Sequence, residues 1–584
     1  MLLFLSQLDF PTGFGEPSPY MSFANSFAMR ISVIQTIDFV AEVRCLIVAY
    51  YDSRHSCRLS APEGETFLTC PDASDAIGAN IHVNVKINFL RERIRTTIGT
   101  VAMTVSIVIV GAGFCGTMTA TWLLSDQTAK PLSIALVDAS YSVSRGIAYR
   151  SDEEGWLLNA PARALSVERD NGNGFVDYCR LRGRPAEPDD FLPRAWYGDY
   201  LAHRLKQAVG KSGKHQFSQH DGYAVALAPE EDGRTKVYLH TGVEISADHV
   251  VLATGHSYGR PSITVAATGG ASLDQRFLAN PWDAVKLRAV PDDSQFFMYG
   301  SGLTALDVVY ALHRRSEKLC FTLMSRRGLL PQHHCRSLPK LQPQARRALL
   351  DQLTAGPRHC LTAVRKVIAE HRARGGDWRE VIDSLRPAVP QIWSNWSEAD
   401  RRAFVRHIAP YWETHRHRQP PSTAALVASL RMSGRLSLMS GRIETISAHG
   451  DGLLLAIRPR AATGSRVVRA SYFVNCTGAG MAPAHSAAAS DTVPHADRLH
   501  RPIAHGCDSL FDQLRRDGIA KFDWAGLCVD ESYRVVRVNG CTNPSLFYIG
   551  PALRRRFWEA TAVPELLMHI ERMTEIMRRQ FSAR

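Results

Sequence analysis

Residues 103–116 read MTVSIVIVGAGFCG, and this stretch decides the fold of the 584-residue chain. Within it, Val105–Val110 is a short apolar run rich in β-branched residues, which predicts a buried parallel strand. The run leads directly into GAGFCG (111–116), and residues 117–124 then have the pattern of a helix. In such a strand–turn–helix unit, one glycine permits the tight turn, one admits a pyrophosphate and one lets the helix pack against the strand. The glycines in these roles are, in that order, Gly111, Gly113 and Gly116.

The residues that follow strengthen the prediction of a dinucleotide site. A second apolar strand, residues 132–137, ends in Asp138. A carboxylate at this place accepts hydrogen bonds from the hydroxyls of an adenosine ribose. The N-terminus of the intervening helix supplies free N–H groups and the positive end of a dipole for phosphate. Strand, turn, helix, strand and acid together favour a nucleotide site over an ordinary glycine loop.

A second copy of the pattern begins further along the chain. Residues 295–299 predict a strand, GSGLTA (300–305) repeats the glycine turn with alanine in third place, and residues 303–313 predict a helix. Gly300 and Gly302 take the places of the first two glycines. The next predicted strand, residues 319–324, leads into Ser-Arg-Arg instead of ending in an acid.

Arg326 and Arg327 stand where a ribose-binding acid would otherwise be found. Guanidinium groups at this place fit the 2′-phosphate of NADP, and the alternative is an ordinary pair of surface arginines. Two turns of different character predict two cofactors, FAD beside Asp138 and NADPH beside the arginines.

Three more segments read as strands that end in glycine turns. They are VVLATG (250–255), YFVNCTG (472–478) and LFYIGP (546–551). The first two are typical of strands that return the chain between two nucleotide domains. We predict cofactor contacts at Gly255, Gly478 and Gly550. Residues 565–579 predict a helix, and a helix N-terminus near Gly550 would stabilise an anionic reduced flavin.

Several motifs resemble a known group of proteins. They are VIVGAGFCGT (108–117), RGIAY (145–149), LLNAPA (157–162), GSGLTALD (300–307), SRRGLLP (325–331), HRHR (415–418) and FWEATAVPE (557–565). The chain from about Met103 to its end resembles the FAD/NAD(P)-binding flavoproteins that include L-aspartate N-monooxygenase and FAD-dependent urate hydroxylase.

The resemblance implies FAD, a reduced nicotinamide cofactor and, for most members, oxygen. It also implies that Asn159, in LLNAPA, contacts the flavin, whereas the residues alone fit a turn before Ala-Pro equally well. One departure is Gly550-Pro551, where many flavoproteins carry Gly-Asp. This difference puts the carboxylate contact to the ribityl chain in doubt.

Most of the net charge of +13 lies between the second arginine pair and HRHR. Residues 326–418 carry 18 basic and 8 acidic side chains, and residues 343–371 and 378–407 have a helical pattern. Arginine grips carboxylates with two parallel bonds. The segment therefore predicts an acidic substrate, with Arg416, His417 and Arg418 as its ligands. The alternative is that these residues pack against acids elsewhere in the chain or lie on the surface.

The predicted fold class is α/β, with two Rossmann-like domains, the NADP domain inserted into a discontinuous FAD domain, and a helical insertion. The boundaries are 103–290 for the first part of the FAD domain, 291–330 for the NADP segment, 331–430 for the basic insertion and 431–584 for the return to both domains. Residues 1–102 show no sustained periodicity. We predict a poorly defined extension there, either disordered or foreign to the native protein, with a small extra domain as the alternative.

These features predict an FAD- and NADPH-dependent monooxygenase that hydroxylates a small, polar, acidic, nitrogen-containing substrate with oxygen, through a flavin C4a-hydroperoxide. The alternatives are a reductase without oxygen transfer and a non-catalytic FAD-binding redox sensor. No catalytic side chain, metal, nucleic acid or membrane is predicted, and the oligomeric state is left open. The 12 cysteines include no C-x-x-C pair, which favours a reducing cytoplasm over a disulfide framework.

Overall fold

The computed structural model describes residues 58–60, 67–69, 104–127, 130–139, 144–149, 156–255, 264–265, 275–335, 341–353, 356–478 and 510–583. The chain divides into two units, Met1–Val101 and Ala102–Arg584. In the first unit, β1 (Arg58–Ser60) pairs antiparallel with β2 (Phe67–Thr69). The other residues of the predicted N-terminal extension, 1–102, lie outside the described residues.

The first sheet of the second unit contains the strand predicted from the opening stretch. Its strand order is β20-β21-β9-β3-β4-β5, and every pair is parallel except β20 with β21. Because both faces of a parallel sheet are covered, its central strands are continuously apolar; Ile107 and Ile109 of β3, for example, are almost fully buried. The bounds are β3 Val105–Val110, β4 Leu132–Asp138, β5 Gln216–Asp221, β9 His249–Leu252, β20 Arg534–Val536 and β21 Thr542–Tyr548.

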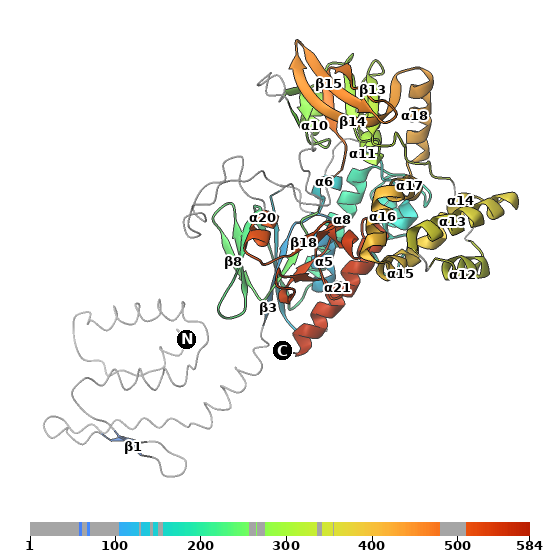
Figure 1. Cartoon of the computed structure of the whole chain (residues 1–584). Coiled ribbons are helices and arrows are strands. Elements are labelled where there is room, and N and C mark those ends of the chain that lie inside the picture. Colours follow the sequence, from blue (N-terminus) through green and yellow to red (C-terminus); the bar gives the residue numbers. More distant parts are fainter. Residues whose placement is uncertain are drawn as a thin grey trace. The chain divides into compact units, whose positions relative to one another are not determined.

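Helix α5 (Phe114–Leu124) follows β3 and packs against both α8 (Arg194–Gly210) and α21 (Val563–Ala583). Figure 1 shows α21, in red, running beside α5 close to this sheet. Elements from both ends of the second unit, β3 and α5 near its start and β21 and α21 near its end, therefore share one hydrophobic core. The smaller elements around it are α6 Gly146–Tyr149, η1 Ala162–Ala164, α7 Gly174–Leu181, β6 Ala224–Pro229, β7 Thr235–Leu239, β8 Glu244–Ala247, α20 Leu510–Arg516, β18 Phe522–Asp523, β19 Gly526–Leu527 and η3 Pro551–Arg555.

The second sheet is built around the second glycine turn. Its order is β11-β17-β12-β13-β14-β15-β16, parallel from β11 to β14 and antiparallel from β14 to β16, with β10 beside β14. Helix α11 (Leu303–Arg315) turns its apolar side chains into a core shared with α18 (Pro421–Met432). The remaining bounds are β10 Thr264–Val265, β11 Phe277–Leu278, α10 Ala284–Arg288, β12 Gln295–Tyr299, β13 Cys320–Ser325, β14 Leu436–His449, β15 Gly452–Pro459, β16 Arg466–Ala470 and β17 Tyr472–Asn475.

The segment between β13 and α18 is helical, as its periodicity predicts. These helices, yellow in Figure 1, enclose a separate core of Leu, Val and Trp side chains, to which Trp558 of the FWEATAVPE segment also contributes. They are α12 Pro343–Asp351, α13 Gly356–Ala373, α14 Trp378–Leu385, η2 Arg386–Ala388, α15 Val389–Asn395, α16 Glu398–His407 and α17 Ala409–Arg416. None of the described helices has the length and apolar character that a membrane crossing requires.

The C-terminal part contains the predicted helix. Residues 565–579 lie within α21, which begins at Val563, and Gly550 is followed directly by the short 3₁₀ helix η3. The helical turn next to Gly550 is therefore η3, and α21 begins after it. Pro551 at the first position of η3 fixes its backbone for a single tight turn, because a proline ring presets φ.

Candidate functional site

The first glycine turn is held by contacts that only glycines allow. Gly111 has a φ of +104°, and its N–H donates to the carbonyl of Val137 at 2.7 Å. A Cβ on Gly111 would lie 2.4 Å from the carbonyl oxygen of Ala253, and one on Gly116 would lie 1.8 Å from the carbonyl oxygen of Gly111. Both glycines therefore serve the close packing of turn, strand and helix.

Gly113 is different, because the protein leaves room beside it. A Cβ there would meet no heavy atom closer than the Cα of Gly146, at 3.7 Å. Gly113 is the N-cap of α5, and no side chain caps that helix end. Packing within the protein therefore does not require a glycine here, and the uncapped helix N–H groups fit a pyrophosphate, which would lie against the backbone where a side chain would otherwise stand.

The sequence did not predict a second wall for this space. Ser144 donates its backbone N–H to the carbonyl of Ala112 at 3.0 Å, and a Cβ on Gly146 would lie 2.9 Å from the Cα of Gly113. The RGIAY segment thus lies directly over the glycine turn. Its signal in the sequence is the glycine itself, since Gly146 has a φ of +51°.

Asp138 lies at the carboxyl end of β4, beside the turn. Its Oδ2 accepts the backbone N–H of Ala112 at 2.6 Å. This bond places the carboxylate next to the glycine turn, as binding of an adenosine ribose requires.

The second turn repeats the construction of the first. Gly300 has a φ of +120°, its N–H donates to Met324 O at 2.8 Å, and a Cβ there would lie 2.1 Å from Cys476 O. A Cβ on Gly302 would find no heavy atom within 4 Å. Ala305, in the third place, is fully buried. The residues of both turns therefore fit two dinucleotides, one on each sheet.

The two arginines after β13 have different surroundings. Arg326 is exposed, as a ligand for a 2′-phosphate must be. Arg327 donates to Tyr411 Oη and to the carbonyls of Arg406 and His407, each at 3.2 Å, and its guanidinium lies 5.0 Å from the Tyr411 ring centroid. Arg327 thus fastens the end of β13 to helices α16 and α17.

The strands predicted to return between the domains lie next to the glycine-turn strands. Ala253 donates to Val110 O and Cys476 donates to Tyr299 O, each at 2.8 Å. Gly255 and Gly478 follow these residues, and both have left-handed backbones, with φ of +67° and +79°. Each is placed at the carboxyl end of its sheet, where ligands of open α/β sheets bind.

Gly550 has a φ of +143° and lies near a buried tyrosine. The Tyr548 hydroxyl accepts the N–H of Ala552 at 3.0 Å, and a Cβ on Gly550 would lie 3.0 Å from that hydroxyl. In place of the carboxylate of a Gly-Asp pair, this turn therefore presents a proline and a tyrosine hydroxyl.

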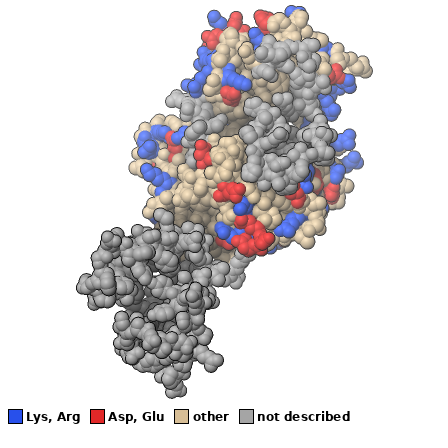
Figure 2. Space-filling view, turned by 90° about the vertical axis from the view of Figure 1, so that its left-hand side faces the viewer, with Lys and Arg blue, Asp and Glu red and all other residues tan. Residues whose placement is uncertain are grey.

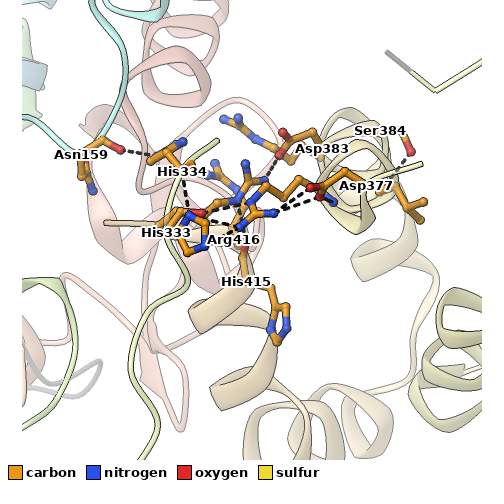
Figure 3. Close-up of polar contacts among 12 residues, drawn as sticks. Asn159, His333, His334, Asp377, Asp383, Ser384, His415 and Arg416 are labelled. Carbon is orange, nitrogen blue, oxygen red and sulfur yellow. Dashed lines mark hydrogen bonds and ion pairs between the residues drawn. The ribbon is translucent and has the colours of Figure 1, made fainter. Parts of the chain in front are cut away.

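Asn159 lies where the two domains and the insertion meet. Figure 3 shows its carbonyl oxygen joined to the ring of His334, at an O–Nε2 distance of 3.0 Å. Arg379 of α14 in turn donates to the carbonyl of His333 at 3.0 Å and pairs with Asp377 at 2.8 Å. The backbone of LLNAPA is therefore tied to the segment that leaves the second sheet.

A pH dependence follows from His334. Burial, with Arg418 as a second cause, lowers its pKa to about 4, so the ring is neutral in the folded protein. Since an unfolded histidine titrates near 6.5, this contribution to stability is present above pH 6.5 and is lost as the pH falls towards 4. Between pH 7 and pH 5, the free energy of unfolding of the wild type should fall by about 2 kcal/mol more than that of His334→Gln. Urea unfolding at both pH values measures it, with the exposed His359→Gln as control. If the free energy of unfolding changed equally with pH in His334→Gln and His359→Gln, His334 would not be the source of this pH dependence.

The residues of HRHR contact acids of the chain itself. Arg416 is buried and pairs with Glu559 at 2.7 Å and Glu565 at 3.2 Å, while Trp412 donates its Nε1 to Glu559 at 2.8 Å. His417 pairs with Glu413 at 3.0 Å. Arg418, also buried, pairs with Asp383 and donates to the carbonyl of His415.

These contacts correct the prediction that Arg416, His417 and Arg418 bind an acidic substrate. Both arginines are buried, and all three side chains already face carboxylates, so an acidic ligand would have to displace Glu559 or Asp383. Packing against acids, the second interpretation of HRHR, describes them. The motifs HRHR and FWEATAVPE, far apart in the sequence, therefore form one ion-pair network.

Glu413 shows how strongly this network is charged. Burial alone would raise its pKa, but Arg554, His417 and Arg416 outweigh burial and hold the pKa at about 2. The carboxylate therefore stays ionised, and its contribution to stability is lost only as the pH falls from about 4.5 towards 2.

We expect Arg416→Met to destabilise the contact between the insertion and the C-terminal segment by about 3–5 kcal/mol, because it leaves Glu559 buried without its guanidinium partner. The matched control is Arg402→Met, whose i,i+4 pair with Glu398 is exposed and contributes about 0.5 kcal/mol at most. Tryptophan fluorescence during urea unfolding reports on the contact, since the rings of Trp393 and Trp558 pack against each other there, with their centroids 4.7 Å apart. Similar midpoints for both variants would refute a stabilising role of the buried network.

Comparisons with known proteins agree with this geometry. Residues 108–257 match the family model described as FAD-NAD(P)-binding. The chain is 24% identical, over 363 residues, to the uncharacterized protein YdhS of Escherichia coli (strain K12); the match covers 52% of this chain and 65% of that protein.

The fold is similar to two solved flavoenzyme structures. An ornithine N-hydroxylase of Kutzneria sp. 744 matches with a TM-score of 0.53 and 16% identity, covering 82% of this chain and 100% of that one. An L-lysine 6-monooxygenase from Pseudomonas syringae matches with a TM-score of 0.52 and 16% identity, covering 82% and 99%. Residues 108–257 therefore match the FAD-NAD(P)-binding family model, and the fold of the chain from its first glycine turn onward is similar to that of the two hydroxylating enzymes.

Proposed function

We propose that this chain is an FAD- and NADPH-dependent monooxygenase that hydroxylates a nitrogen atom of a small polar substrate. The observation that carries the proposal is the pair of glycine turns with opposite chemistry beside them. One turn has a carboxylate, Asp138, at the neighbouring strand end, and the other has the exposed Arg326. The first combination suits the plain ribose of FAD and the second suits the 2′-phosphate of NADPH.

The chain's own residues have three tasks in this proposal. The turn at 111–116 and the N-terminus of α5 bind one pyrophosphate, and the turn at 300–305 and the N-terminus of α11 bind the other. Asn159 holds the flavin edge, in a segment that His334 fixes. When bound, a flavin would supply the redox chemistry between NADPH and oxygen.

The substrate class in this proposal follows the two similar structures. They are an ornithine N-hydroxylase and an L-lysine 6-monooxygenase, and this analogy supports nitrogen as the atom that is oxygenated. The acidic character predicted from HRHR has lost its basis, because those side chains face acids of the chain. We therefore propose the amine or amide nitrogen as the defining feature of the substrate.

The test starts with the absorbance spectrum of the purified protein after addition of FAD. NADPH should bleach the flavin spectrum without oxygen, and air should restore it. Amino acids, diamines and purines are then screened with isotopically labelled oxygen. A hydroxylated product carrying the label supports the proposal. NADPH oxidation with every substrate but no labelled product would indicate a reductase, and a protein that takes up no FAD would overturn the proposal altogether.

A further inference from the structure

Arg194, the first residue of α8, contacts three separate parts of the molecule. Its Nε donates to the carbonyl of Leu157 at 3.0 Å, and its Nη2 pairs with Asp307 at 2.6 Å. Its guanidinium also lies 5.3 Å from the ring centroid of Trp282. Only 12% of the Arg194 side chain and 9% of the Asp307 side chain are exposed.

These partners lie on opposite sides of the boundary between the two sheets. Helix α8 belongs to the core of the first sheet, and Leu157 stands two residues before Asn159. Asp307 is the fifth residue of α11, the helix that starts at the second glycine turn. Trp282 lies in the core of the second sheet, and there it packs edge-on, at 4.8 Å, against Trp156, the residue before Leu157.

The pairing is chemically demanding. Burial raises the pKa of Asp307 to about 6, and the adjacent Arg194 acts in the opposite direction. The carboxylate is therefore ionised at neutral pH with Arg194 as its counter-charge. A buried pair of this kind has one good geometry, and a change to either partner leaves the other charge uncompensated.

We propose that Arg194 is a positioning residue that fixes helix α11, and with it the NADPH-binding turn, relative to the LLNAPA segment that faces the flavin. The inference rests on the proposed function. Hydride transfer requires the two rings to meet in one geometry, and a misplacement of about 1 Å can cost on the order of 100-fold in rate. The single side chain of Arg194 contacts both the LLNAPA segment, at Leu157, and helix α11, at Asp307.

The experiment compares Arg194→Met, Arg194→Lys, Asp307→Asn and the double variant Arg194→Met/Asp307→Asn with wild type. The matched control is Arg184→Met. Arg184 pairs with Asp199 at 2.7 Å and lies 5.1 Å from the Trp196 ring centroid, but both partners belong to α8. The control therefore removes the same kinds of contact without touching the second sheet.

The first readout is the rate of flavin reduction by saturating NADPH without oxygen. Dithionite serves as the comparison, because it reduces the flavin without binding to the second domain. We expect Arg194→Met to slow reduction by NADPH at least tenfold, with FAD content, NADPH affinity and the dithionite rate within about twofold of wild type. The double variant should be no slower than Arg194→Met, because Arg194 acts through Asp307. Arg194→Lys should recover part of the rate.

The second readout needs no activity. In the FAD-free protein, hydrogen exchange in segments 156–160 and 303–312 should be faster in Arg194→Met than in Arg184→Met. A protein that NADPH cannot reduce even as wild type would defeat the proposed function and leave this readout to decide the role of Arg194. Unchanged exchange and reduction in Arg194→Met, or equal losses in Arg184→Met, would overturn the positioning role.

Discussion

Gly116→Ala is expected to yield a protein without bound FAD. Its new methyl group would lie 1.8 Å from the carbonyl oxygen of Gly111 and 3.2 Å from a methyl of Ile109, so α5 must move away from β3. That movement displaces both the glycine turn and the helix N-terminus, the two elements that would hold the pyrophosphate. The ratio of flavin to protein absorbance after incubation with excess FAD measures the loss.

Gly113→Ala is the matched control, because it separates packing from ligand binding. Its methyl group has room in the protein, with the nearest heavy atom at 3.7 Å. We expect thermal unfolding of the FAD-free protein close to that of wild type, and an affinity for FAD at least tenfold lower. Full FAD occupancy in Gly116→Ala, or unchanged affinity in Gly113→Ala, would mean that no pyrophosphate approaches this turn.

The second large effect concerns the choice of nicotinamide cofactor. We expect Arg326→Ala combined with Arg327→Ala to raise the KM for NADPH about 100-fold while changing the KM for NADH little. Charge-assisted hydrogen bonds to phosphate contribute about 1.5–3 kcal/mol, and each 1.4 kcal/mol corresponds to about tenfold. Steady-state reduction of the flavin with each cofactor provides the measurement.

The single variants sharpen this prediction. Arg326→Ala should account for most of the selectivity, because Arg327 is already hydrogen-bonded to Tyr411 and to two carbonyls. Arg314→Ala is the control, since that exposed arginine lies at the far end of α11. Equal losses with NADPH and NADH in Arg326→Ala would contradict the assignment of the 2′-phosphate site.

Much of the fold could be predicted because its signals are local. A glycine turn, the apolar strand before it and the helix after it lie within about 20 residues, and their periodicity is visible in the sequence. Strand Gln295–Tyr299 is found with the predicted bounds. Helix α21 is longer than predicted and extends from Val563 to Ala583.

The interpretation of the basic segment failed for the opposite reason. The acids that pair with Arg416 lie more than 140 positions away, in FWEATAVPE, so no local pattern shows that its charge is compensated. The pair of Arg194 and Asp307 is similarly remote, at a separation of 113 positions. The sequence shows the residues of both pairs, but no local pattern predicts which of them meet.

Figure 2 illustrates why net charge alone was a weak guide. On that face, Lys and Arg side chains occur in several separate groups with Asp and Glu among them. A net charge of +13 over 584 residues therefore does not make this face uniformly positive. Part of the excess counted in the sequence is also buried, as Arg416 and Arg418 show.

The strand order of the first sheet has a consequence for synthesis of the protein on the ribosome. Strand β9 pairs with β3 on one side and with β21 on the other. While residues 253–541 are being made, the β21-facing edge of β9 has no partner, for about 15–60 s at ordinary elongation rates. An apolar strand edge exposed for so long is a site for misassembly. We therefore expect a chain that ends before residue 542 to keep this edge unpaired and to aggregate more readily than the full-length chain.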